Sequence, residues 1–176
     1  MANGEKNIST DWKQCYERFG ILNLLMHIHW LLKRFDELTP YQLYTILQLR
    51  NEVFVVEQNC VFQDADDRDQ SSHHLMGFSE DKLVAYTRIV PPGEMYIEVS
   101  IGRVVTSTTA RGTGVGRLLM HKSIEVVNEL YGNVDIKLGA QFYLKKFYSS
   151  LEFEQVSDIY LEDGIEHIYM LRKARS

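Results

Sequence analysis

Alternation of apolar and polar residues predicts several strands in the middle of the chain. The runs His74–Ser79 and Lys82–Val90 alternate in this way, with a turn at Glu80–Asp81 between them. The longer run Met95–Ser107 predicts a third strand, in which a bulge is expected near Gly102.

Two stretches carry apolar residues at the spacing of an α-helix. In Gly114–Tyr131 they fill one half of the helical wheel, which predicts an amphipathic helix. The other helix begins at Thr39, an N-cap residue followed by Pro40 at the first helical position and by Gln42 at the capping-box position. The residues of this helix expected to face the core are Tyr41, Tyr44, Leu47 and Val53–Phe54.

The N-terminal part predicts an extension outside the main domain. After a polar tail, apolar residues predict a helix over Thr10–Leu32 that packs on the domain or contacts a second subunit, as in a homodimer. The alternating segment Lys33–Leu38 predicts a short strand. We therefore assign residues 1–32 to a tail and helical extension, and residues 33–176 to one domain.

Strand and helix patterns alternate in the C-terminal part. Asp135–Gln141 predicts a strand, Phe142–Leu151 a short helix, and the last segment a hairpin around Asp163–Gly164, because an Asp-Gly pair favours a tight turn. The order of elements predicts an α/β or α+β domain built on one mixed sheet flanked by helices.

Length and composition limit the classes of protein to consider. The 176 residues are enough for one domain with a core. The 24 acidic and 19 basic residues give a net charge of −5, which argues against binding nucleic acid through a basic face. The longest apolar run, Ile21–Leu32, is shorter than the roughly 20 residues of a membrane span. Neither a nucleic acid nor a membrane is therefore expected as a partner.

The cysteines and the acidic residues predict no metal site. Cys15 and Cys60 fit neither a C-x-x-C nor a zinc spacing, which favours a reduced protein in the cytoplasm. The segment Asp64–Asp69 departs from the calcium-loop pattern, since Arg68 and Asp69 stand where the fifth ligand and the glycine are required. We expect a solvated loop there, with a contact to a cation or an amine as the alternative.

The densest glycine cluster is RGTGVG, residues 111–116, between a predicted strand and a predicted helix. Free backbone N–H groups and the positive end of the helix dipole suit such a turn to binding an anion. Arg117 and Leu118 stand where a P-loop needs Lys and then Ser or Thr, and Arg117 also replaces the third glycine of a dinucleotide-binding fingerprint. A glycine turn without a ligand remains the alternative.

This turn and a later segment resemble the GNAT superfamily of N-acetyltransferases. RGTGVG is similar to the R/Q-x-x-G-x-G/A signature of that superfamily, and QFYLKKFYSSLEF, residues 141–153, is similar to its closing N-x-x-A-x-x-F-Y-x-x-x-G-F pattern. The matching positions are Arg111, Gly114, Gly116, Phe147, Tyr148 and Phe153, and the departures are Gln141, Leu144 and Glu152.

Further segments resemble one branch of the superfamily, the ElaA type. The similarity runs from about Arg34 to Lys173 and includes LQLRNEVFVVEQNCVFQDADDRD, VAYTRIV, IGRVVTS and YLEDGIEHIYM. The sequence also resembles a eukaryotic offshoot of this branch, the apicomplexan-type glucosamine-6-phosphate N-acetyltransferases. The resemblance implies a single-domain GNAT fold, with a mixed, mostly antiparallel sheet that splays open.

The resemblance also implies how acetyl-CoA, the co-substrate of the superfamily, is bound. Its pyrophosphate is expected on the backbone of the glycine turn and its pantetheine arm along the preceding strand, with no metal involved. The expected cofactor-binding residues are Val104, Val105, Thr106, Arg111, Gly112, Thr113, Gly114, Val115, Gly116 and Gln141.

GNAT enzymes transfer the acetyl group directly from the thioester to an amine, so the resemblance implies a catalytic acid and a catalytic base. Tyr148 is expected to give its proton to the CoA sulfur. Glu98 is the first candidate for the base, because several members of the superfamily carry a carboxylate on the fourth strand. His167 and His74 are alternatives, since imidazole with an ordinary pKa near ~6.5 suits neutral pH.

The acceptor is expected to be the primary amine of a small molecule. Glucosamine 6-phosphate is the leading candidate, and a polyamine, a peptide or another amine are alternatives. Arginine or lysine would bind a sugar phosphate, whereas an acidic pocket would bind a polyamine. The expected substrate-binding residues are Arg50, Glu57, Gln58, His74, Arg88 and Arg103.

Two other functions stay open. One is a non-catalytic CoA-binding module that docks to a partner through Ile21–Leu32. The other is an acyltransferase of the acyl-homoserine lactone synthase kind, which LRNEVF followed by acidic residues resembles. The tryptophan that such synthases carry after this segment is absent, since Asn59, Cys60 and Val61 stand there.

Overall fold

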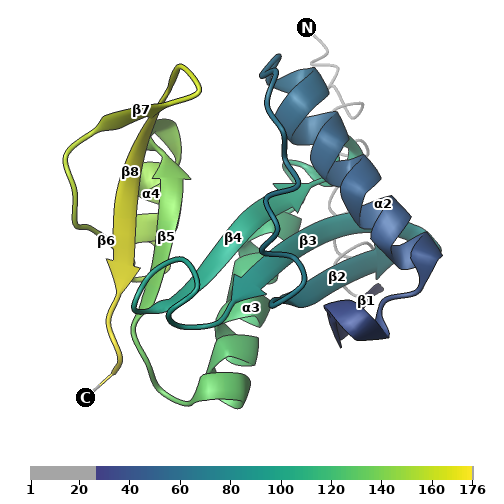
Figure 1. Ribbon diagram of the computed structural model, residues 1–176, viewed down its shortest axis with the longest axis horizontal. Coiled ribbons are helices and arrows are strands. Elements are labelled where there is room, and N and C mark those ends of the chain that lie inside the picture. The colour runs from purple at the N-terminus through teal and green to yellow at the C-terminus, as the bar shows by residue number, and fades with distance from the viewer. Residues whose placement is uncertain (1–26, 176) are drawn as a thin grey trace, which may run out of the picture.

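An eight-stranded mixed sheet runs through the computed structural model, which describes residues 27–175 (Figure 1). The strands lie in the order β1-β2-β3-β4-β5-β8-β6, and β7 pairs with β8 off this path. Their bounds are β1 Ile28–Arg34, β2 His73–Ser79, β3 Lys82–Val90, β4 Val99–Thr106, β5 Ile136–Gln141, β6 Glu154–Gln155, β7 Tyr160–Glu162 and β8 Ile165–Arg172.

Helices cover both faces of this sheet. The α-helices are α2 Pro40–Arg50, α3 Val115–Tyr131 and α4 Lys145–Ser149; a π-helix, η2 Asn51–Glu57, continues α2, and short 3-10 turns occupy η1 Phe35–Glu37, η3 Thr108–Ala110 and η4 Phe142–Leu144. Ile46 and Leu49 of α2 pack with Met76 and Tyr86 of the sheet in one buried cluster. The buried residues of α3 and α4 form a second cluster with other strand residues, among them Ile101. The predicted class, one mixed sheet flanked by helices, is confirmed.

The pair β4 and β5 is the only parallel pair among the described strands, and it separates early. Its partners are Val99 with Ile136 and Ser100 with Lys137, after which the two strands diverge (Figure 1). On its other edge, β4 is bulged: Gly102 pairs with Arg88 and Val105 pairs with Tyr86. Arg103 lies within the bulge with a φ of +51°. The bulge expected near Gly102 is therefore present, and it bends β4 away from β5.

Several predicted boundaries are confirmed where the sequence carries a local signal. The Thr39 Oγ1 accepts a hydrogen bond from the Gln42 N–H at 3.2 Å, and the Gln42 Oε1 accepts one from the Thr39 N–H at 3.0 Å, so the capping box forms. The turn between β7 and β8 has a φ of +51° at Asp163 and +80° at Gly164, as a tight Asp-Gly hairpin requires.

The predicted helix over Thr10–Leu32 is wrong at its C-terminal end. Residues 28–32 belong to β1 and pair with β2, while the rest of that helix, up to residue 26, lies outside the described residues. The strand predicted over Lys33–Leu38 is present only at its first two residues, because Phe35–Glu37 form a 3-10 turn. A short apolar run is compatible with helix or strand, and here pairing with β2 selects the strand.

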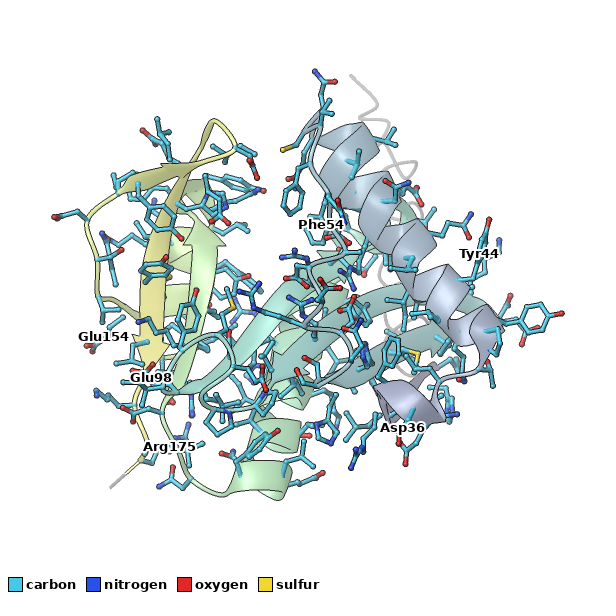
Figure 2. All side chains as sticks on the ribbon, viewed as in Figure 1. Asp36, Tyr44, Phe54, Glu98, Glu154 and Arg175 are labelled. Atoms are coloured by element: carbon cyan, nitrogen blue, oxygen red, sulfur yellow. The ribbon has the colours of Figure 1, made fainter. Side chains whose placement is uncertain are left out.

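The predicted core face of the helix after Thr39 is wrong for Tyr41, Tyr44 and Leu47 and confirmed for Val53. Tyr41 is 85% exposed and Tyr44 69% exposed, and Figure 2 shows Tyr44 pointing away from the sheet. Ile46 and Leu49, which were not predicted, are buried against the sheet together with Val53. The long strand predicted from Met95 begins only at Val99. Among the described residues, no helix is long and apolar enough to cross a membrane.

Candidate functional site

A cleft of about 750 Å³ opens where β4 and β5 separate. Its inner walls are the backbone and side chains of Ile101–Thr106 on β4 and of Gly139–Gln141 on β5. Phe147 and Tyr148 of α4 close it on one side. The bulge in β4 and the early end of the β4–β5 pairing therefore create the space.

The glycine turn forms one lip of this cleft. Gly112 has a φ of +74° and Gly114 a φ of +93°, the left-handed region that glycine adopts without strain. Gly114 is the N-cap of α3, so the positive end of the helix dipole points toward the turn. Apart from its two chain neighbours, none of the described residues has a heavy atom within 4 Å of the position that a Cβ on Gly112 would take. The backbone of the turn is thus open to an anion.

Tyr148 lies in the wall of the cleft, 4% exposed. Its ring packs against the rings of Phe147 and Phe153, with centroid distances of 5.1 and 6.1 Å. Burial raises the pKa of the Tyr148 phenol well above its ordinary value. The phenol therefore carries its proton at neutral pH, which a group that donates to a leaving sulfur must do.

His167 lies on the β8 wall, in register with Gln141 of β5. Its Nδ1 is 2.9 Å from the Ile165 carbonyl oxygen, and when Nδ1 carries the proton it donates a hydrogen bond to that oxygen. That tautomer leaves Nε2 as an acceptor.

Tyrosines cover the same wall. The Tyr160 ring lies 4.8 Å from the Tyr169 ring and 5.9 Å from the His167 ring, and Tyr96 packs on Tyr169 at 5.6 Å. All four side chains line the cleft. Gly139 leaves room for them, since a Cβ there would lie 3.4 Å from the Tyr160 hydroxyl oxygen. This wall is aromatic with hydroxyl groups, and its tyrosines were not predicted as site residues from the sequence.

The C-terminal end of η2 forms the opposite lip. The Gln58 Oε1 accepts a hydrogen bond from the Gln141 Nε2 at 3.1 Å, which joins this end to β5. Glu57 forms a two-bond ion pair with Arg111 of the glycine turn, in which Arg111 Nη2 donates to Glu57 Oε2 at 2.7 Å. Figure 2 shows Phe54 of η2 projecting toward the cleft.

A buried cluster of arginines and aspartates lies beneath this lip. Arg50 Nε donates to Asp64 at 2.6 Å, and its Nη1 donates to Asp69 at 2.9 Å. Arg88 Nη1 donates to Asp69 at 2.8 Å and its Nη2 to Asp66 at 2.8 Å. The expectation of a solvated acidic loop is wrong, because three of its carboxylates neutralise arginines.

The charges of this cluster shift the pKa values of its members. Burial opposes ionisation of Asp66 and Asp69, but the neighbouring arginines outweigh it, so the pKa of each carboxyl lies below its ordinary value. Burial lowers the pKa of His74, whose Nδ1 is 2.8 Å from the Tyr86 hydroxyl and whose Nε2 is 3.0 Å from the Asp69 carbonyl oxygen. His74 is therefore neutral and fully engaged inside the protein.

The structure brings most of the predicted site residues together at the cleft. Those that line it are Val104, Val105, Thr106, Arg111, Gly116, Gln141, Tyr148, His167, Glu57, Gln58, Arg88 and Arg103. Gly112, Thr113, Gly114 and Val115 complete the turn and the start of α3 beside it.

Three predicted residues lie elsewhere. Arg50 and His74 are fully buried in the aspartate cluster and do not line the cleft. Glu98 precedes β4 at the end where β4 and β5 are still paired, away from the cleft (Figure 2). Arg88 reaches the lining but is 1% exposed, with its guanidinium held by Asp66 and Asp69. No group of three or more potential metal ligands occurs in residues 27–175.

The relatives of the chain agree with this architecture. The model of the acetyltransferase (GNAT) domain matches residues 42–174. Protein ElaA of Escherichia coli is 44% identical over 148 residues, 83% of this chain and 97% of ElaA. A UPF0039 protein of Synechocystis is 43% identical over 147 residues, 83% of this chain and 96% of that protein.

A solved structure extends the similarity to three dimensions. The crystal structure of an acyl-CoA N-acyltransferase from Pseudomonas aeruginosa has a TM-score of 0.80 to this chain at 41% identity, and covers 82% of this chain and 99% of its own. These relatives give no support to the narrower resemblance to glucosamine-6-phosphate acetyltransferases. The chain belongs to the GNAT acetyltransferase family, in its ElaA-like branch, and has the GNAT fold of the acyl-CoA N-acyltransferases.

Proposed function

We propose that the protein is an N-acetyltransferase that moves the acetyl group of acetyl-CoA directly to the primary amine of a small molecule. The observation that carries this proposal is the cleft between β4 and β5, with the glycine turn at its lip and protonated Tyr148 in its wall. Acetyl-CoA, when bound, supplies the activated acetyl group.

The residues around the cleft fit such a donor. The open backbone of Gly112 and the N-terminus of α3 suit the pyrophosphate. Because β4 pairs with β5 only at Val99 and Ser100, the edge of Val104–Thr106 that faces β5 is available to the pantetheine arm. Arg111 adds a guanidinium for the phosphates.

Side chains of the cleft supply both proton transfers. The amine nitrogen forms a bond to the acetyl carbon, and the carbon–sulfur bond breaks. Tyr148 donates its proton to the departing sulfur, and His167 takes the proton that the nitrogen loses. We assign the base to His167, because neither Glu98 nor His74 lines the cleft.

A cationic amine agrees better with the cleft than glucosamine 6-phosphate does. Arg50 and Arg88 are committed to aspartates, so a phosphate would find only the partly exposed guanidinium of Arg103 on that side. Carboxylates and tyrosines are more available: Glu162, Asp163 and Tyr160 line the opposite wall. Both types of acceptor therefore belong in the same test.

The test measures release of the CoA thiol from acetyl-CoA in the presence of putrescine, glucosamine, glucosamine 6-phosphate or a short peptide. We expect turnover with at least one amine, and a Tyr148→Phe variant that loses about 10²-fold or more in kcat while its Kd for CoA stays the same. The matched control is Tyr143→Phe, which removes the hydroxyl group of an exposed tyrosine at the rim of the cleft and should leave kcat unchanged.

Two results would contradict the proposal in different ways. Absence of turnover with every amine, together with CoA binding, would indicate a non-catalytic CoA-binding module. Full activity of Tyr148→Phe would remove Tyr148 from the role of acid and leave the transfer itself intact.

A further inference from the structure

The ion pair between Arg111 and Glu57 joins the two lips of the cleft. Arg111 belongs to the glycine turn before α3, and Glu57 ends η2, 54 residues earlier in the chain. Arg111 Nη1 and Nη2 each donate to a different oxygen of the Glu57 carboxylate. The Glu57 side chain is 40% exposed and that of Arg111 41% exposed, and both line the cleft. The pair therefore bridges the mouth of the cleft.

Binding of the donor can readily break the ion pair between Arg111 and Glu57. An exposed ion pair changes an equilibrium constant only about fivefold at most, because water screens it. A pyrophosphate on the glycine turn is an anion that offers Arg111 the bidentate geometry that guanidinium favours. Arg111 at the start of α3 also gains from a nearby anion, since the helix dipole is positive there. Donor binding therefore competes directly with Glu57 for Arg111.

Loss of Arg111 leaves Glu57 facing the cleft without a cation. Among the described residues, the carboxylates that line the cleft are Glu57, Asp64, Glu162 and Asp163, and the guanidinium groups are Arg88, Arg103 and Arg111. Arg88 and Arg103 stay paired with aspartates of the buried cluster. The balance of four carboxylates against three guanidiniums becomes four against two when the phosphates engage Arg111. The acceptor side of the cleft then attracts a cation.

We propose that Glu57 binds the cationic group of the acceptor, and that Arg111 masks Glu57 until the donor is in place. The inference rests on the proposed binding of CoA at the glycine turn. It assigns the acceptor to the ammonium-bearing amines, and it makes donor and acceptor bind with positive coupling: each strengthens the binding of the other by the same factor.

The experiment measures equilibrium binding by calorimetry, with CoA as the donor probe and putrescine as the cationic probe. In the unmodified protein we expect CoA to strengthen putrescine binding by up to about fivefold, the amount by which an exposed ion pair can change an equilibrium constant. In Glu57→Gln the coupling is lost, whereas CoA itself binds as well as before or up to about fivefold more tightly, because its competitor for Arg111 is weakened. A glutamate that merely supported the turn would give the opposite result for CoA.

The matched control is Glu129→Gln. It removes the same charge from an exposed position of α3 that does not line the cleft, so both CoA affinity and coupling should stay as in the unmodified protein. Coupling that persists in Glu57→Gln, weaker CoA binding by that variant, or no coupling in the unmodified protein would each overturn the inference. Failure of CoA to bind at all would instead refute the proposed donor site.

Discussion

At the scale of single residues, Gly114 and Gly116 show how one motif contains two different requirements. Gly114 has a φ of +93° as the N-cap of α3, a conformation that strains any residue with a Cβ. Gly116 lies inside α3 with an ordinary helical backbone, and a Cβ there would meet only the Thr106 methyl carbon, at 3.9 Å. Gly114 is needed because of its backbone conformation, whereas Gly116 is needed at most because it leaves space beside Thr106.

We therefore expect Gly114→Ala and Gly116→Ala to differ sharply. Gly114→Ala should lower the free energy of unfolding by about 1–2 kcal/mol and weaken CoA binding, because the turn must shift to relieve the strain. Gly116→Ala should fold with equal or slightly greater stability, since alanine favours the helix, and should retain CoA binding. Urea denaturation and calorimetry with CoA measure the two properties. Equal behaviour of the variants would contradict the distinction.

Residue types at the site were predictable from sequence, but their partners were not. The glycine turn and Tyr148 lie within continuous motifs, so their neighbours in sequence identify them. Arg50 is brought to Asp64 and Asp69 only by folding, and nothing local distinguishes it from an arginine in the cleft. Tyr96 and Tyr169 meet from different elements for the same reason.

At the scale of elements, β1 is the segment whose structure depends most on its neighbour. Trp30 of β1 pairs with Gly77 of β2, and a Cβ on Gly77 would lie 2.7 Å from the Trp30 Cζ3 and 3.2 Å from the Ala85 Cβ. The absence of a side chain at Gly77 is thus what lets the indole lie across β2 and hold β1 on the sheet.

Gly77→Ala should lower the free energy of unfolding by about 1–3 kcal/mol, because the added methyl group forces Trp30 to move. Combining it with Trp30→Leu should recover part of that loss, so the two effects should not add. Gly102→Ala is the matched control, because within residues 27–175 its Cβ would have no heavy atom within 4 Å beyond those of its two chain neighbours. Denaturation of Gly77→Ala, of Trp30→Leu, of the double variant and of Gly102→Ala tests this. If Gly77→Ala left the free energy of unfolding unchanged, Trp30 would not lie over Gly77.

Elements with local signals were predicted well, and those selected by tertiary pairing were not. The capping box at Thr39 and the Asp-Gly turn at Asp163–Gly164 act over a few residues, so the sequence alone indicates them. Residues 28–32 carry an apolar run that a helix or a strand would bury equally well, and only the edge of β2 decides between them.

At the scale of the whole molecule, the cleft and the buried charge cluster depend on each other. The bulge that opens the cleft places Arg103 between β4 and the acidic segment, where its Nε lies 2.7 Å from Asp64. The same aspartates hold Arg50 beneath η2, which carries one lip of the cleft. The stability of the cluster should therefore be visible in the stability of the entire fold.

The titrating groups of this cluster all act in the same direction with pH. The pKa of Asp66, of Asp69 and of His74 lies below its ordinary value in the folded protein, so the folded state binds fewer protons than the unfolded state does. Stability from His74 is present above about pH 6.5 and is lost as the pH falls below that value; stability from the aspartates is lost below about pH 4.

We therefore expect the free energy of unfolding to decline in two stages on acidification, the first beginning below about pH 6.5 and the second, steeper one below about pH 4. His74→Gln should reduce the slope of the first stage, leaving a remainder from His73, whose pKa is also lowered by burial. It should leave the second stage in place, because Asp66 and Asp69 keep their arginines.

Urea denaturation at several pH values across this range measures the free energy of unfolding. The slope of that free energy against pH, and not its absolute value, tests the prediction. A curve that stays level down to about pH 5 in the unmodified protein would show that His74 accepts a proton without unfolding, and that the cluster is more open to water than its packing indicates.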